Sequence, residues 1–261
     1  SGRVVSRFRA GINLVFNEEA GDPGWVAVQE EGVPLHPWAI QVNRCPPAAV
    51  ADPAHACSGR LQLPDGYTLD LSTAVVDPLR IEPYALDQAA WTTARLPWLQ
   101  GLVAERRATG PTDPFRPSID SVLHRWERTD DAGRLVDLVG LGSGSTPGGD
   151  DVLVGMLAAE SAKGGSTIHQ SVAAIRLLER TRLFSARMIE AAIDGAVTEP
   201  LRDLLVQFGD RRTSIHSLRW SVERVLQQGA TSGTWLLCGL ATALPGPRRT
   251  ERQSYSSRRA E

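Results

Sequence analysis

A short stretch of glycines, small hydroxyl residues and paired carboxylates is the part of this 261-residue chain best suited to chemistry. It reads Gly-Leu-Gly-Ser-Gly-Ser-Thr-Pro-Gly-Gly-Asp-Asp over residues 140–151. Glycines remove side chains that would keep a ligand away from the backbone, and hydroxyls supply hydrogen bonds. The adjacent carboxylates Asp150 and Asp151 could act as a base, hold a cationic or amide nitrogen, or hold Mg²⁺. The residue types leave these roles open.

The residues after this stretch predict a buried helix. Thr146 can cap a helix and Pro147 suits its first position, and the run from Val152 to Ala158 is apolar nearly all round. The amino end of a buried helix carries unpaired N–H groups and a positive dipole end, which an anion would satisfy. The alternative is that the turn is only a tight connection and that the two carboxylates are favourable charges near a helix start.

A second segment repeats this chemistry. Thr231-Ser232-Gly233 places small hydroxyls and a glycine before another apolar helix over residues 234–244. Read alone, it fits an ordinary cap made by a serine or threonine side chain. Together, the two segments predict two helix amino ends that face one cavity.

These patterns define the predicted site. Its catalytic residues are Asp150 and Asp151, and its ligand-binding residues are Gly142, Ser143, Gly144, Ser145, Thr146, Gly148, Gly149, Thr231, Ser232 and Gly233. No metal-ligating residues and no cofactor are assigned, although the two carboxylates could take Mg²⁺. Thr181 and Ser185, one helical turn apart, are expected to hydrogen-bond their own backbone.

Other reactive residues offer weaker patterns. Cys45, His55 and Cys57 supply three possible zinc ligands without a second compact pair, which argues against a structural zinc site. Lys163 is the only lysine, so the Gly-rich stretch is not a nucleotide-binding loop of the type that needs one. Lys163 lies near the far end of the predicted buried helix, where a cation complements the helix dipole.

The Gly-rich stretch resembles the Gly-Leu-Gly-Pro-Gly-Leu-Thr-Pro-Ser-Gly-Asp-Asp signature of the oxamate carbamoyltransferase subunit AllH family. The chain departs from that signature at Ser143, Ser145 and Gly148. Residues 181–195 and 229–240 resemble two further segments of the family. In the second of these, Ala230 stands where the family tends to have His, and Thr234-Trp235 replaces Trp-Asp. The specific part of the resemblance covers residues 138–240.

The resemblance implies carbamoyl transfer. Relatives act with partner subunits that convert an N-carbamoyl 2-oxo acid and phosphate into carbamoyl phosphate and oxamate. It therefore implies an enzyme, or an enzyme subunit, that binds a carbamoyl- or phosphate-type small-molecule anion at the Gly-rich helix start. Two alternatives remain. Residues 140–145 also resemble the phosphate loop of small-molecule kinases of the galactokinase–homoserine kinase type, which would bind a nucleotide, and a third reading is a non-catalytic regulatory subunit.

Composition fits a soluble globular protein. Hydrophobic residues make up 42% of the chain and charged residues 22%, with a formal net charge of −2. That balance gives no reason to expect nucleic acid or an anionic membrane as a partner. Three cysteines suit a reducing compartment better than a disulfide framework, so we expect a cytoplasmic protein.

Strand and helix patterns occur in separate runs, which predicts an α+β fold with a mainly antiparallel amino-terminal β region and a carboxy-terminal helical region. Predicted strands cover residues 9–16, 25–29, 38–42, 59–63 and 67–71, and residues 45–57 are expected to form an irregular loop. Predicted helices cover residues 83–107, with a break or kink at Pro97, and residues 118–138, 171–194, 200–208, 214–228 and 234–244. The predicted domains are residues 3–110 and 118–244, joined by a linker, with a disordered tail over residues 245–261.

Overall fold

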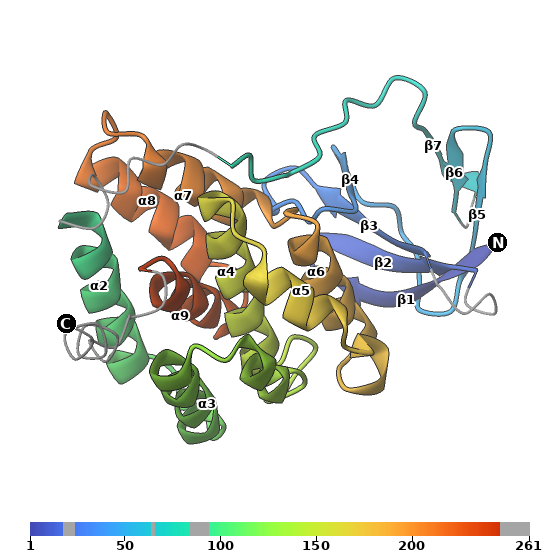
Figure 1. The fold of residues 1–261 in the computed structure, drawn as a ribbon. Coiled ribbons are helices and arrows are strands. Elements are labelled where there is room, and N and C mark those ends of the chain that lie inside the picture. Colours follow the sequence, from blue (N-terminus) through green and yellow to red (C-terminus); the bar gives the residue numbers. More distant parts are fainter. Residues whose placement is uncertain (18–23, 64–65, 84–93, 246–261) are drawn as a thin grey trace, which may run out of the picture. The chain divides into compact units, whose positions relative to one another are not determined.

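The chain divides into two compact units of different secondary structure. The computed structural model describes residues 1–17, 24–63, 66–83 and 94–245. Contacts group Ser1–Leu79 into an amino-terminal unit and Arg80–Glu261 into a carboxy-terminal unit. The first is a sheet and the second is helical, so the predicted α+β class is confirmed (Figure 1). The predicted domain boundaries stay a prediction, and the predicted tail from residue 246 lies outside the described residues.

The described part of the amino-terminal unit forms a seven-stranded sheet in the order β4-β3-β2-β1-β5-β6-β7. The strands are β1 (Gly2–Phe8), β2 (Gly11–Phe16), β3 (Gly24–Glu30), β4 (Ala39–Val42), β5 (Pro53–Cys57), β6 (Arg60–Gln62) and β7 (Thr68–Asp70). All neighbouring pairs are antiparallel except β3 and β4, which are parallel. The core of the unit gathers apolar side chains such as Ile12, Leu14 and Val28.

Two strands were not predicted. β1 buries only Val4, and its other positions include exposed or half-buried arginines and serine, so it lacks the apolar alternation that indicates a strand. β5 lies within residues expected to form an irregular loop. It starts at Pro53 and buries only Ala54, which gives an equally weak signal.

Helices make up most of the described part of the carboxy-terminal unit. Its helices are α2 (Leu96–Thr109), α3 (Arg116–Thr129), η4 (Ala132–Leu138), α4 (Gly148–Lys163), α5 (Thr167–Ala173), η5 (Leu177–Glu179), α6 (Leu183–Ile193), α7 (Glu199–Gly209), α8 (Ile215–Leu226) and α9 (Ser232–Ala243). Pro97 lies in the first turn of α2, where a proline is tolerated. Residues 84–93 of the predicted helix lie outside the described residues, so the predicted break or kink at Pro97 stays a prediction.

The helix predicted over residues 171–194 is interrupted. The chain instead forms the end of α5, the short turn η5 and then α6. Leu177 is buried in η5, and the next residues, Arg180 to Arg182, run past the Gly-rich turn. Contacts to that distant segment replace the helical hydrogen bonds expected from local pattern alone.

The helices α4 and α9 pack against each other and run in the same direction. At one end the Thr146 and Ser232 hydroxyls are 2.9 Å apart, and at the other Lys163 Nζ donates to the Ala243 carbonyl at 2.8 Å. Between these two ends, Gly155 and Gly239 each face the backbone of the other helix. A Cβ on Gly155 would lie 2.1 Å from the Leu236 carbonyl oxygen. A Cβ on Gly239 would lie 1.9 Å from the Val152 carbonyl oxygen, so the two helices meet backbone to backbone.

The helix α4 is buried nearly all round, as its sequence predicts. Of its residues only Ser161 and Lys163 are not buried. Lys163 also forms an ion pair with Glu160 of the same helix at 2.6 Å. Together with its hydrogen bond to Ala243, this contact connects the carboxy-terminal ends of α4 and α9.

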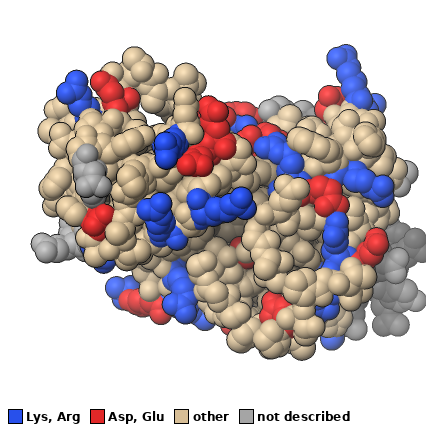
Figure 2. All heavy atoms as spheres, turned by 180° about the vertical axis from the view of Figure 1, so that it is seen from behind, with Lys and Arg blue, Asp and Glu red and all other residues tan. Residues whose placement is uncertain are grey.

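Charges of both signs are spread over the surface. Figure 2 shows basic and acidic side chains interspersed on the face in view. Among the described residues, no helix combines the length and the apolar character needed to cross a membrane.

The close approach of α4 and α9 makes a testable prediction about stability. Gly239→Ala should lower the free energy of unfolding by about 2–3 kcal/mol, because the added methyl group forces two backbones apart. Gly101→Ala is the matched control, because it also lies within a helix but a Cβ there meets nothing within 4 Å. That variant should be neutral or more stable by about 0.5–1 kcal/mol. Urea denaturation measures both, and equal effects would contradict a backbone contact at Gly239.

Candidate functional site

The Gly-rich turn folds tightly onto the start of α4. The Gly149 N–H donates to the Leu141 carbonyl at 2.8 Å. A Cβ on Gly149 would lie 2.2 Å from the Leu138 carbonyl oxygen, so a larger residue cannot take this position without moving the backbone. Gly149 therefore serves the shape of the turn.

Most N–H groups at the amino end of α4 already have acceptors. The Asp150 and Asp151 N–H groups donate to the Pro147 carbonyl at 2.9 and 3.1 Å, and Gly149 is engaged as described. Within the described residues, Gly148 alone in this first turn has an N–H group without an acceptor. The sequence predicted several unpaired N–H groups at the amino end of this helix, whereas the structure leaves one.

The carboxylate of Asp150 is buried and fully hydrogen-bonded. Its side chain is 1% exposed, and its Oδ1 accepts the Gly140 N–H at 2.7 Å. Its Oδ2 accepts the Ser185 hydroxyl at 2.6 Å and also the Thr181 hydroxyl. Burial raises the pKa of Asp150, and the hydrogen bonds from Ser185, Thr181 and Gly140 oppose that rise. Asp150 thereby ties the Gly-rich turn to the start of α6.

The structure corrects the expectation for Thr181 and Ser185. Their hydroxyls were expected to bond their own backbone, but both donate to Asp150 from more than 30 residues away in sequence. A buried carboxylate needs hydrogen-bond donors, and these two hydroxyls supply them.

The neighbouring carboxylate of Asp151 is buried but only partly satisfied. The residue is 7% exposed, and its Oδ2 has no hydrogen-bond partner among the described residues. Burial raises the pKa of Asp151 well above its ordinary value, a hydrogen bond from Ser232 opposes the rise, and the charge of Asp150 adds to it. Two adjacent carboxylates thus have different surroundings.

The two helix starts lie together, and that they face one cavity stays a prediction. The hydroxyls of Thr146 and Ser232 share a hydrogen bond at 2.9 Å, and Ser232 also hydrogen-bonds to the carboxyl group of Asp151. The result is a chain of hydrogen bonds from Thr146 through Ser232 to Asp151. Beside it, Gly233 approaches α8: a Cβ there would lie 2.2 Å from the Val225 carbonyl oxygen.

A tryptophan fills the space beside Gly148. A Cβ on Gly148 would lie 2.8 Å from Nε1 of Trp235, and that nitrogen donates to Asp113 at 2.9 Å. Gly148 and Trp235 are two of the positions at which the chain departs from the family patterns. The geometry links them, because an indole at 235 leaves no room for the serine side chain that the signature has at 148.

The tip of the turn is exposed and contacts an arginine. Ser143, Gly144 and Ser145 are exposed, and Gly144 has a φ of +89° with nothing within 4 Å of an added Cβ. The Arg182 Nε–H donates to the Gly144 carbonyl at 3.0 Å. Sequence reasoning missed Arg182, although it lies next to Thr181 in one of the segments that resemble the family.

The carboxylates offer little to a metal ion. Both oxygens of Asp150 already accept hydrogen bonds, so a Mg²⁺ ion here would have Asp151 as its one carboxylate ligand. Among the described residues, no three His, Cys, Asp or Glu side chains gather closely enough to hold a metal ion.

Comparison with known families locates the same region. Residues 138–244 match the family described as oxamate carbamoyltransferase subunit AllH. The resemblance predicted from the sequence is confirmed over this range, which contains the Gly-rich turn and the starts of α4, α6 and α9. No curated protein and no solved structure matches the chain significantly.

The different surroundings of the two carboxylates predict different costs of removal. Asp150→Ala should lower the free energy of unfolding by about 3 kcal/mol, because one buried and two half-buried donors lose their acceptor. Asp151→Ala should cost about 1 kcal/mol, because one hydrogen bond is lost and the burial of a carboxyl group is relieved. Urea denaturation at pH 7 measures the difference. Equal losses would show that the three hydrogen bonds to Asp150 do not form.

The raised pKa of Asp151 predicts a pH dependence of stability. Between the ordinary carboxyl pKa, about 3.9, and the raised value, the folded chain binds a proton that the unfolded chain has released. Stability should therefore fall as pH rises through this window. In Asp151→Asn this contribution disappears, so the variant should gain stability relative to the parent chain between pH 4 and 8. Thermal melts across that range test this, and parallel curves would contradict it.

Proposed function

We propose that this chain is a carbamoyltransferase-related subunit whose Gly-rich turn binds a carbamoyl- or phosphate-type anion. One observation supports this proposal most strongly. The family match over residues 138–244 covers three separate segments, and the fold brings all three to one point around Asp150 and Asp151. Segments that match a family model and also meet in space are expected to form a functional site.

Positive potential at the turn supports an anion as ligand. The parallel starts of α4 and α9 each contribute a positive dipole end equivalent to about half a charge. Gly148 offers a backbone N–H, and the exposed hydroxyls of Ser143 and Ser145 offer donors. Arg182 uses Nε to hold Gly144, and its two Nη groups have no partner among the described residues. An arginine presented in this way suits a phosphate or carboxylate.

The two carboxylates would then have different roles in the site. Asp150 positions the turn, because both of its oxygens are engaged by the chain itself. Asp151 has a raised pKa and an Oδ2 without a hydrogen-bond partner among the described residues, so it holds a proton more readily than an ordinary aspartate and would donate it to a substrate carbonyl or leaving group. The hydroxyl chain from Thr146 through Ser232 orients its carboxyl group. Thr231 and Gly233 would shape the start of α9.

The family description names AllH as a subunit. We therefore propose that the chain works with partner enzyme subunits on a small-molecule substrate. If Mg²⁺ takes part, Asp151 and the substrate oxygens would hold it.

Ligand titrations separate this proposal from the two alternatives. Calorimetry should show binding of carbamoyl phosphate and of inorganic phosphate, and weaker binding or none for ATP with Mg²⁺. Tighter binding of ATP–Mg²⁺ would favour a nucleotide-binding, kinase-like protein. Binding of none of these ligands would favour a non-catalytic regulatory subunit.

Arg182 gives the sharpest single test. Arg182→Gln should weaken phosphate binding about ten- to a hundredfold, because it removes a charge-assisted hydrogen bond to the anion. Arg176→Gln is the matched control, since that arginine pairs with Glu179 on the surface and is 84% exposed. Calorimetry on both variants, with thermal melts on the same samples, measures the effect. Equal affinities for the two variants would remove Arg182 from the site.

A further inference from the structure

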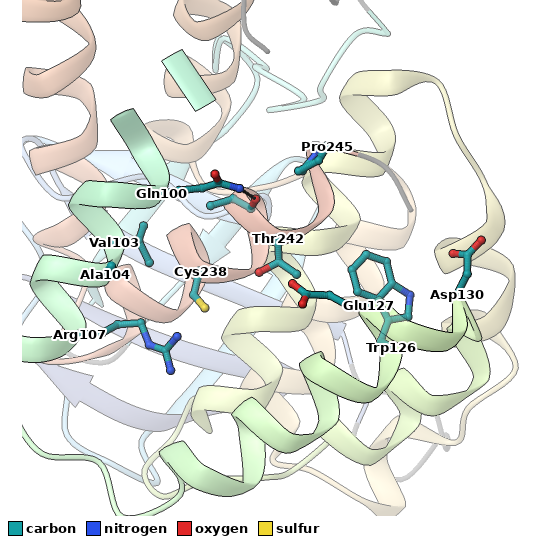
Figure 3. Close-up of a pocket in the computed structure, with 11 residues that line it drawn as sticks. Gln100, Val103, Ala104, Arg107, Trp126, Glu127, Asp130, Cys238, Thr242 and Pro245 are labelled. Atoms are coloured by element: carbon teal, nitrogen blue, oxygen red, sulfur yellow. Dashed lines mark hydrogen bonds between the residues drawn. The ribbon is translucent and has the colours of Figure 1, made fainter. Parts of the chain in front are cut away.

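A cavity of about 170 Å³ is bounded by α2, α3 and α9 (Figure 3). None of the residues of the Gly-rich turn lines it. Its lining includes Gln100, Arg107, Trp126, Glu127, Asp130 and Thr242. The proposed function uses none of these residues.

The charges that remain free at this cavity are negative. Arg107 is neutralised by an ion pair with Asp120, and its guanidinium lies 5.0 Å from the ring centre of Trp235. Within the part of the chain that the structure describes, the carboxylates of Glu127 and Asp130 have no ion-pair partner. The cavity therefore favours a cation over an anion.

Hydrogen-bond acceptors surround one end of the cavity. Figure 3 shows the Glu127 carboxylate and the Thr242 hydroxyl beside each other, with Gln100 on the facing helix. The Gln100 amide nitrogen donates to the Ala241 carbonyl, which leaves the amide oxygen as an acceptor. Trp126 adds an aromatic wall on the α3 side. A guanidinium group has five N–H donors and no acceptor, and it packs well on an aromatic face.

From this geometry we propose that the cavity is a binding site for a guanidinium group. The ion pair to Glu127 supplies charge, and Gln100 and Thr242 supply acceptors. The cavity is large enough for one such group with a short aliphatic stem. This site would be separate from the anion site in both place and chemistry.

Two sources could supply the guanidinium. One is a small free molecule such as an alkylguanidine. The other is the chain itself, because Pro245 lines the cavity and Arg248 and Arg249 follow it by three and four residues in sequence. The chemistry at Glu127 is the same in both cases, and the experiment separates them.

The test is a titration of the full chain with agmatine, followed by calorimetry. N-butylurea is the neutral control ligand, since it keeps the butyl chain and a planar head group and lacks both cationic groups of agmatine. Glu127→Gln should weaken agmatine binding about tenfold or more, because it removes a charge-assisted hydrogen bond. Glu105→Gln is the matched control variant, because it removes an exposed carboxylate of α2 that does not line the cavity.

A double variant, Arg248→Gln with Arg249→Gln, identifies the source. Equal agmatine affinity in this variant and the parent chain would assign the site to a free ligand. At least tenfold tighter binding in the variant would show that the chain's own arginines occupy the site. The proposal is overturned if neither chain binds agmatine, if N-butylurea binds as tightly, or if Glu127→Gln behaves like Glu105→Gln.

Discussion

The close parallel contact between α4 and α9 is the constraint on which the rest of the carboxy-terminal unit depends. Gly155 and Gly239 allow the two backbones to meet, and Lys163 fastens the far ends through the Ala243 carbonyl. Because the helices are parallel, their amino ends must come together. That is why Thr146 and Ser232, which are 86 residues apart in sequence, share a hydrogen bond.

Parallel packing also creates an electrostatic problem that the site resolves. Two positive helix ends placed side by side repel each other unless negative charge lies near them. Asp150 and Asp151 lie in the first turn of α4, but both are buried, and burial disfavours their charged forms. Asp150 is supported by three hydrogen bonds, whereas Asp151 keeps a free oxygen and a strongly raised pKa. Burial of the two carboxylates therefore weakens the negative charge that would offset the two helix ends.

Local sequence patterns predicted the parts of this arrangement that depend on neighbouring residues. The apolar run after Pro147 predicted the buried helix, and the repeated small hydroxyls predicted that the two helix starts meet. The α+β class followed from strands and helices in separate runs. Strands β1 and β5 were not predicted, because each buries one residue and has no clear alternation of apolar and polar residues.

Contacts between distant segments could not be predicted from one sequence. Two of the three donors to Asp150 come from residues 181 and 185, across a helix break that local periodicity does not show. Arg182 reaches the turn only because of that break. Likewise, Gly148 and Trp235 are separate departures from the family patterns in sequence, and only the structure shows that they occupy one space.

The most direct test of the central claim is an NMR titration of ¹⁵N-labelled chain with carbamoyl phosphate. We expect the Gly148 and Ser232 amide signals and the Arg182 Nε–H signal to shift the most. Glycines of the amino-terminal unit, such as Gly59, should stay unchanged. Largest shifts elsewhere in the chain, with Gly148 and Arg182 unmoved, would contradict an anion site at the start of α4.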